Sequence, residues 1–330
     1  RETEVRTVAH PEQRDLFVEL EFHALAKDHA VSAPAAPRET SYVTVDTLPA
    51  LDAMLRRIRS APHIAVDTET VMELGSPQIV DPLRSTLVSI SIAVAPGEAY
   101  YLPLRHRERQ GDQGDLLIDV SGDRSPTDAT EDRGLVRGGD EPPPAPKKKA
   151  ARKKPASAGE PSGIAARLLA ERKHEVRNLP ALMSDAMEPL RAMLEDPSIR
   201  KTAQNAKYDL LALRRAGVTL RGLDFDTMIA SYVLDPGRRS HGLDVLALEF
   251  LEHTMTSYED LCGKGKGSVP FDECPVEAAR DYSCEDADMT FQLRAVFEPQ
   301  LETYALLPLF NDIEIPLINV LADMEWAGIA

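Results

Sequence analysis

The stretch Ile64-Ala-Val-Asp-Thr-Glu-Thr70 constrains more than any other what this chain can fold into. Its three apolar residues predict a buried strand. The strand then delivers Asp67 and Glu69, which share a face because side chains two apart in a strand point the same way. Two adjacent carboxylates at the end of a core strand repel each other, and a cation between them relieves that cost. The pair therefore predicts a site for Mg²⁺ or Mn²⁺, with an exposed strand end as the simpler alternative.

The composition limits the class of protein. The 330 residues are 43% hydrophobic, which is enough for one large domain or two modest ones. The chain has no transmembrane run and no signal-peptide pattern, and its three cysteines form no Cys-x-x-Cys pair, so we expect a reducing, cytoplasmic location. The net charge of −16, taken over the whole chain, argues against a nucleic-acid partner. The sum does not give the local charge of a binding cleft, however. The first residue is Arg1 rather than Met, so we expect an internal fragment.

Two stretches interrupt the pattern of a folded domain. Residues 1–30 carry a short helical apolar stripe without a core of their own, and residues 31–41 are typical of a linker. Residues 106–176 hold clusters of Asp, Gly, Pro, Ser and Ala, and we interpret them as a largely disordered insertion that ends in a short helix over 164–173. The basic run 147–154 is either a non-specific contact for DNA phosphates or a solvated charge block.

The remaining chain predicts an alternation of strands and helices. The meander of three successive strands between residues 64 and 104 is expected to lie at one side of a mixed sheet, because tight turns join antiparallel neighbours. We expect order to resume at Asn178 and a flexible basic loop over 262–270. The predicted strands are 42–45, 64–70, 86–94, 99–104 and 199–205, and the predicted helices are 48–60, 182–194, 207–216, 225–234, 243–251, 276–304 and 314 onward.

Two further acids have positions that call for a reason. Asp209 falls in the first turn of a predicted helix, where the helix dipole favours an acid and a capping role is the simple alternative. Tyr282 and Asp286 are four residues apart in the long predicted helix and therefore share a face. Asp has weak helical propensity, so its position in the middle of the helix suggests a function for Asp286, with surface exposure as the simple alternative. Three acids next to this pair are expected to face solvent: Asp281, Glu285 and Asp288.

Taken together, the motifs resemble those of a known family. They are Val66-Asp-Thr-Glu-Thr70, Gln204-Asn-Ala-Lys-Tyr-Asp209 and Tyr282-Ser-Cys-Glu-Asp-Ala-Asp-Met-Thr290. In this order they are similar to the 3′→5′ exonucleases with four acidic metal ligands, in the subgroup with a Tyr four residues before the last Asp. The similarity is closest to the proofreading exonuclease domain of bacterial family A DNA polymerases and covers residues 42–105 and 178–330. It implies an α/β fold with a ribonuclease H-like mixed sheet flanked by helices.

The resemblance implies a chemistry and a set of residues. It implies two divalent metal ions, Mg²⁺ or Mn²⁺, with Glu69 and the Tyr282 hydroxyl orienting the attacking water. The implied metal ligands are Asp67, Glu69, Asp209 and Asp286. The wedge leucine of the family has no clean counterpart, and Met72 or Leu74 stands in its place, while Tyr258 aligns with an aromatic that stacks on the terminal bases. The candidate substrate contacts, several of which packing explains equally well, are Thr68, Met72, Leu74, Gln204, Asn205, Tyr208 and Tyr258.

The resemblance also implies a domain organisation. Residues 1–30 correspond to the tail of a 5′-nuclease domain, 42–310 to the exonuclease domain and 311–330 to the start of the polymerase domain. The implied partners are single-stranded DNA 3′ ends, primer–template DNA, and the polymerase and 5′-nuclease domains of the same chain, in a nucleoid-associated monomer without a membrane partner. Well-known members of the family lack an insertion like 106–176. Two alternatives stay open: an exoribonuclease resembling ribonuclease D, and a catalytically silent module that positions DNA.

Overall fold

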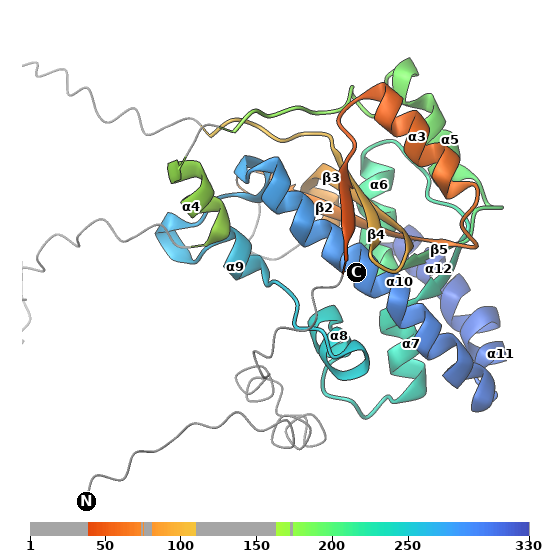
Figure 1. The fold of residues 1–330 in the computed structure, drawn as a ribbon. Helices are drawn as coiled ribbons and strands as arrows, with labels where there is room; N and C mark the ends of the chain where they lie inside the picture. The colour runs from red at the N-terminus through yellow and green to blue at the C-terminus, as the bar shows by residue number, and fades with distance from the viewer. Residues whose placement is uncertain (1–38, 74, 76–80, 110–162, 172–173, 330) are drawn as a thin grey trace, which may run out of the picture. The chain divides into compact units, whose positions relative to one another are not determined.

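A mixed six-stranded sheet lies at the centre of the structure (Figure 1). The computed structural model describes residues 39–73, 75, 81–109, 163–171 and 174–329, and all of these except Arg109 belong to one unit. The strands are β1 (Ser41–Thr44), β2 (Ile64–Met72), β3 (Ser85–Ala95), β4 (Glu98–Pro103), β5 (Lys201–Ala203) and β6 (Leu223–Asp226). Their order is β1-β4-β3-β2-β5-β6. Strands β2, β3 and β4 pair antiparallel and the other pairs are parallel, so the predicted meander and the α/β fold are confirmed.

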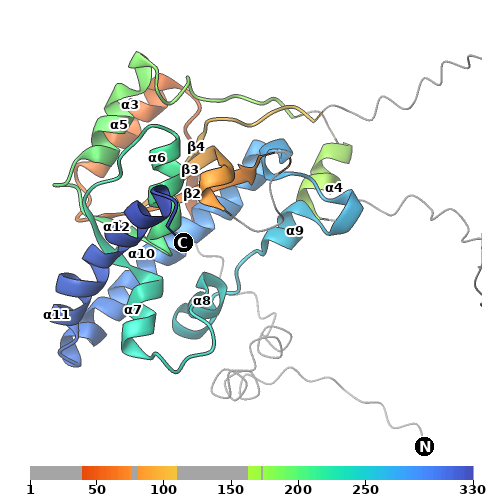
Figure 2. The ribbon, with the colours of Figure 1, turned by 180° about the vertical axis from the view of Figure 1, so that it is seen from behind.

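Helices cover both faces of this sheet. The helices are α3 (Leu48–Ile58), α4 (Ile164–Glu171), α5 (Glu188–Glu195), α6 (Ala206–Arg215), α7 (Thr227–Leu234), α8 (Leu243–Leu251), α9 (Tyr258–Cys262), α10 (Val276–Thr303), α11 (Leu307–Leu309) and α12 (Ile315–Trp326). The long α10 crosses one face, and α6 lies on the other (Figures 1 and 2). Among the described residues no single helix is long and apolar enough to span a membrane; one pair, Val276–Thr303 and Leu307–Trp326, reaches that length only with a 117° bend.

The two faces of the sheet carry different side chains, because successive residues of a strand point to opposite sides. Large aliphatic residues such as Val66 and Ile90 face α3, α5 and α6. Alanines dominate the face under α10, with Ala65 and Ala93 on the strands and Ala279 on the helix. Small side chains on both surfaces let α10 lie close to the sheet. The close approach brings the middle of α10 next to β2.

Ordered structure extends into both ends of the predicted insertion. The His106 backbone N–H donates a 2.8 Å hydrogen bond to the side chain of Asn178. In α4, Ala165 and Ala166 are buried in the core that α9 and α10 share. The predicted helix after residue 164 is therefore confirmed over 164–171, and the prediction that order resumes only at Asn178 is wrong. Residues 110–162, with the basic run, and residues 1–38 lie outside the described residues.

Two predicted elements begin differently in the structure, and the final helix has a packing that the sequence did not predict. The predicted helix 225–234 begins as a strand, because β6 pairs with β5 before Asp226 caps α7. Helix α9 precedes the predicted flexible loop and already includes Cys262. The final helix α12 packs on α6, where Ile315 and Ile318 are buried and the Arg214 guanidinium lies 4.4 Å from the Trp326 ring centroid.

Candidate active site

The predicted site starts at the strand β2. Residues 64–66 are buried, and the alternation of the strand then turns Asp67 and Glu69 toward α10 and Thr68 toward α6. Strand β5 pairs with β2 only as far as Ala65. Beyond that point the edge of β2 is open toward the first turn of α6. The expected strand-end position is wrong, because β2 continues to Met72: the acids lie in the middle of the strand, where its pairing with β5 has ended.

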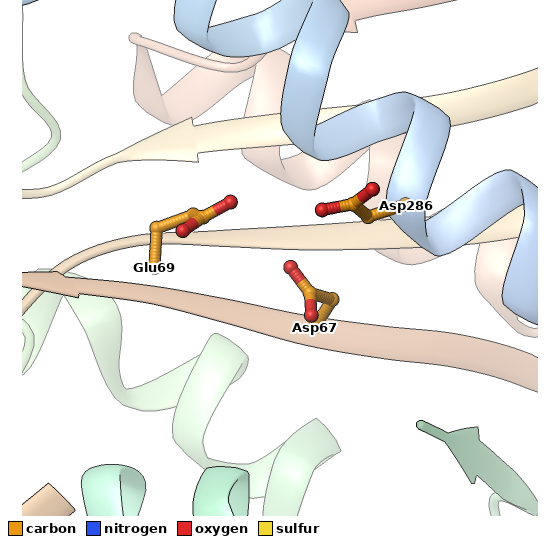
Figure 3. Close-up of side chains that lie close together, drawn as sticks. All are labelled: Asp67, Glu69 and Asp286. Carbon is orange, nitrogen blue, oxygen red and sulfur yellow. The ribbon is translucent and has the colours of Figure 1, made fainter. Parts of the chain in front are cut away.

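Asp286 of α10 joins the two strand acids. One carboxylate oxygen from each of Asp67, Glu69 and Asp286 lies within 4.8 Å of the other two. Figure 3 shows the three side chains pointing into one space between β2 and α10. The Ser91 hydroxyl donates a 3.5 Å bond to Asp67, and the Ser283 hydroxyl donates a 3.1 Å bond to Glu69. The predicted spatial meeting of Asp286 with the strand pair is thus present.

Burial and mutual repulsion oppose ionisation of this group. Burial raises the pKa of Asp67 to about 6. Burial, followed by the charges of Asp67 and Asp286, raises the pKa of Glu69 well above its usual range. The pKa of Asp286 is raised in the same way, by burial and then by the charge of Asp67. A divalent cation would offset both the burial of the charged carboxylates and the repulsion between them. Such cations prefer oxygen donors, so the three carboxylates fit a divalent cation site.

Asp209 reaches the site from the other side of β2. It is only 3% exposed, and its Oδ1 accepts a 2.6 Å hydrogen bond from the Thr68 hydroxyl. Burial raises its pKa, and the charge of Asp67 raises it further, which means that the two carboxylates interact. Asp209 lies outside the group of three whose oxygens meet within 4.8 Å. The described arrangement is therefore a tight cluster of three acids with a fourth beside Asp67.

The capping role that was the alternative for Asp209 belongs to another residue. Asp226 accepts the backbone N–H of Ala206 at 2.7 Å and that of Asn205 at 3.3 Å, so it satisfies the start of α6. Asn205 adopts a left-handed conformation with φ of 61°, which Asn tolerates better than most residues. This sharp entry directs the first turn of α6, and Asp209 with it, toward β2. Helix capping therefore does not account for the burial of Asp209.

Tyr282 stands one helical turn before Asp286 and hydrogen-bonds its carboxylate. Burial and the charges of the nearby acids raise the pKa of the Tyr282 hydroxyl, which therefore stays protonated and can donate. The Tyr258 ring packs edge-on against Tyr282 with centroids 6.4 Å apart, and Phe271 packs against it at 6.3 Å. Tyr258 is 47% exposed, so part of its side chain is accessible to a ligand.

The structure gives two of the other predicted substrate contacts internal partners. The Gln204 side chain donates to the carbonyl of His241 at 2.8 Å and accepts from the Thr227 hydroxyl. These hydrogen bonds give Gln204 a structural role, which is the packing alternative to a substrate contact. The Tyr208 hydroxyl lies 2.5 Å from the Thr70 hydroxyl, at the end of β2. Tyr208 therefore fixes the strand end next to the acids.

The remaining candidates differ in exposure. The Thr68 side chain is buried, and its hydroxyl is taken by Asp209. Met72 is half-buried, with its sulfur 3.2 Å from the Ser85 hydroxyl, and Asn205 is exposed at the start of α6. Leu74 lies outside the described residues.

Sequence reasoning misplaced two acids of α10. Asp281 is exposed as expected, but Glu285 and Asp288 are not solvated. Glu285 accepts a 2.7 Å bond from His253, and Asp288 is 1% exposed and accepts a 2.9 Å bond from the Tyr42 hydroxyl. The helix-propensity argument used for Asp286 applied equally to Asp288 and would have found it.

Comparisons with known proteins agree with this geometry. A family model described as 3′-5′ exonuclease matches residues 165–302, a range that includes Asp209, Tyr282 and Asp286. The DNA polymerase I of Rhizobium leguminosarum is 33% identical over 315 residues, which cover 92% of this chain and 24% of that protein. The DNA polymerase I of Pseudomonas aeruginosa is 31% identical over 293 residues, covering 88% of this chain and 24% of that protein.

Solved structures share the fold at low identity. The POL domain of Pol1 from M. smegmatis, in complex with DNA primer-template and dNTP, has a TM-score of 0.50 at 16% identity and covers 86% of this chain and 31% of that chain. Brucella melitensis NrnC has a TM-score of 0.50 at 17% identity and covers 88% of this chain and 95% of that chain.

The six-stranded mixed sheet is an α/β fold of the ribonuclease H-like class, and residues 165–302 match a family model described as 3′-5′ exonuclease. More particularly, about nine tenths of the chain is similar to part of DNA polymerase I. It spans about a quarter of the length of the curated relatives that it matches.

Proposed function

We propose that this chain is the proofreading part of a DNA polymerase I and removes nucleotides one at a time from single-stranded or mispaired DNA 3′ ends. The observation that carries the proposal is the meeting of Asp67, Glu69 and Asp286 within 4.8 Å, from two elements far apart in the sequence. Three carboxylates with raised pKa values are poorly suited to binding a phosphate by themselves, because like charges repel. They are well suited to binding divalent cations, and the cations would then contact the phosphate.

The proposed cofactors are two Mg²⁺ or Mn²⁺ ions. Asp67, Glu69 and Asp286 would hold one, and Asp209 with Asp67 would hold the other. When bound, divalent cations neutralise phosphate charge, activate water and stabilise the leaving oxygen. The contribution of Tyr282 is a hydroxyl that stays protonated and donates from the rim of the cluster. Ser283 donates a hydrogen bond to one oxygen of the Glu69 carboxylate and so restricts its rotation.

We infer that the substrate is a frayed single strand. The half-exposed Tyr258 ring offers a stacking face beside the acids, and stacking on an aromatic tolerates any base, as proofreading requires. A duplex keeps its terminal base stacked on its neighbour, whereas a mismatch releases it. Selection for mispaired ends is then explained by the cost of unstacking rather than by base-specific contacts.

The proposed domain organisation is that of the relatives. We propose residues 42–310 as the exonuclease domain and residues 311–330 as the start of the polymerase domain, with 1–30 as the end of a 5′-nuclease domain. The packing of α12 on α6, with the ion pair of Arg214 and Asp323 at 2.7 Å, supports a direct connection between the exonuclease domain and residues 311–330. The proposed partners are therefore primer–template DNA and the neighbouring domains, in a monomer located in the cytoplasm at the nucleoid.

Replacing Asp209 with Ala tests the proposal. We expect Mg²⁺-dependent shortening of a 5′-labelled single-stranded oligodeoxynucleotide to fall by ~10³-fold or more, because removal of a charged group from a preorganised phosphoryl-transfer site costs at least as much as loss of one transition-state hydrogen bond. The measurement is the rate of product appearance on a sequencing gel, with circular dichroism to check that the fold is retained.

The matched control is Asp52→Ala, which removes an exposed acid from α3 and should leave the rate unchanged. Trimming by Asp209→Ala at the control rate would reject the site. An RNA oligonucleotide of the same sequence separates the substrates: faster loss of RNA than of DNA would reject proofreading in favour of an exoribonuclease.

A further inference from the structure

Two buried thiols face each other beside the active-site aromatics. Cys262 ends α9, Cys274 comes directly after the 3₁₀ turn Phe271–Glu273, and their sulfurs are 3.6 Å apart. Each residue is only 1% exposed. A disulfide needs its sulfurs about 2.05 Å apart, so a small movement of either side chain closes the bond. The third thiol, Cys284, is buried on α10, so it serves as an internal control.

The segment between the two thiols is a short, glycine-containing loop whose ends lie close together. Residues 263–268 include Gly263 and Gly265, both with positive φ, which only glycine adopts without strain. The ends of the segment are already held together, because the Val269 backbone N–H donates to the Cys262 carbonyl at 2.7 Å. A covalent bond between Cys262 and Cys274 would therefore join two points that the fold has already brought together.

Cys262 is buried directly beneath a half-exposed side chain, and its thiol differs in pKa from that of Cys274. The half-exposed Tyr258 stands one turn earlier on α9, and its hydroxyl hydrogen-bonds the Cys262 sulfur. Cys262 thus lies one side chain below the surface. Hydrogen bonds from Cys274 and Tyr258 lower the pKa of the Cys262 thiol, while the pairing with Cys262 and burial raise the pKa of Cys274. Cys262 is therefore the thiol suited to attack an oxidant, and Cys274, with its sulfur 3.6 Å away, is in position to resolve the product.

We propose that Cys262 and Cys274 are a redox modification site that a hydroperoxide converts to a disulfide. The Cys262 thiolate attacks one peroxide oxygen, the O–O bond breaks, and the released hydroxide leaves as water after taking a proton. The sulfenic acid formed on Cys262 is then attacked by the Cys274 sulfur. The S–O bond breaks, and the Cys274 proton leaves with the hydroxide as a second water. Two thiols are oxidised by two electrons, and hydrogen peroxide is reduced to two waters.

The disulfide acts on the substrate surface, a consequence that rests on the proposed function. It fixes the end of α9 to the segment that begins at Phe271, and both Tyr258 and Phe271 contact the Tyr282 ring. Cross-linking a loop also reduces the freedom of its ends. The oxidised protein is expected to hold the Tyr258 ring in one orientation, and DNA trimming should change in KM rather than in kcat.

The test is a mass measurement that does not depend on nuclease activity. The full chain is treated with hydrogen peroxide, alkylated after unfolding without reductant, and digested. We expect a peptide pair that joins Cys262 to Cys274 and weighs two hydrogens less than its parts, with Cys284 alkylated, and we expect dithiothreitol to reverse the link. Alkylation of all three cysteines after peroxide treatment, or a link to Cys284 instead, would overturn the proposal.

Two variants sharpen the result. In Cys274→Ser the resolving thiol is absent, so Cys262 should stop at a sulfenic acid that dimedone traps, whereas Cys284→Ala should form the disulfide at the wild-type rate. Dimedone labelling of the wild type equal to that of Cys274→Ser would contradict the pairing. If the disulfide forms in a protein that trims no DNA, the modification site stands and the proposed function fails.

Discussion

Replacing Asp67 with Asn is expected to abolish Mg²⁺-dependent trimming and, in the same protein, to make the metal-free fold more stable. The rate should fall by ~10³-fold or more, because Asp67 is the acid shared by the tight cluster and by Asp209. The free energy of unfolding at pH 7.5 in EDTA should rise by about 1 to 3 kcal/mol, because the pKa of Asp67 is raised and its charge disfavours the native state. Single-turnover trimming and urea unfolding measure the two effects.

The pH dependence gives the sign of the second effect. A carboxyl group whose pKa is higher in the folded state favours folding while it is protonated, so its contribution is complete at low pH and is lost as pH rises through the folded value, about 6 for Asp67. The metal-free wild type should therefore lose stability between about pH 4 and about pH 6, and Asp67→Asn should lose less. The control Asp281→Asn removes an exposed acid of α10 and should behave like the wild type. Lower stability of Asp67→Asn in EDTA at pH 7.5 would contradict the repulsion between the acids.

Replacing Arg294 with Met is expected to cost about 3 to 5 kcal/mol of folding free energy, since it removes several charge-assisted hydrogen bonds of a buried guanidinium, while Asp224 keeps its ion pair with Arg200. Arg294 is 1% exposed on α10. Its guanidinium donates to Asp224 of β6 at 2.8 and 3.0 Å and to the Thr202 hydroxyl of β5 at 2.9 Å. The same group lies 4.9 Å from the Phe225 ring centroid. One side chain thus ties the parallel edge of the sheet to the helix that carries Asp286.

The matched control is Arg280→Met on the same helix. Arg280 pairs with Asp281, whose side chain is 62% exposed, and exposed pairs contribute less than about 1 kcal/mol. Urea unfolding of the two variants should therefore differ by at least about 2 kcal/mol. Equal losses would mean that the Arg294 network adds nothing beyond a surface pair.

The parts of the fold with strong local patterns could be predicted from the sequence. The apolar run before Asp67, the alternation over 86–94 and the long helix containing Tyr282 are all present in the structure. Each pattern is set by which side chains face the core, and the sequence records that directly. The order of the strands in the sheet, with β5 and β6 beyond β2, depends on pairings between distant segments. Periodicity within one segment carries no information about those pairings.

The failures come from elements too short to have a period. Strand β6 has four residues and runs directly into α7, so its apolar residues resemble the first turn of a helix. Helix α9 has five residues, and its one local signal is the capping box at Ser257. At the site, the partners of Glu285 and Asp288 come from segments about 30 and 190 or more residues away. No local pattern could have revealed those contacts.

The central claim is that Asp67, Glu69 and Asp286 form a cage for a divalent cation, and crystals soaked in Mn²⁺ test it most directly. Anomalous diffraction locates the manganese without any assumption about activity. We expect a peak in the space between β2 and α10, within coordination distance of an oxygen from each of the three carboxylates, and its loss in Asp67→Asn. The absence of a peak there, in crystals that show manganese elsewhere on the protein, would contradict the cage.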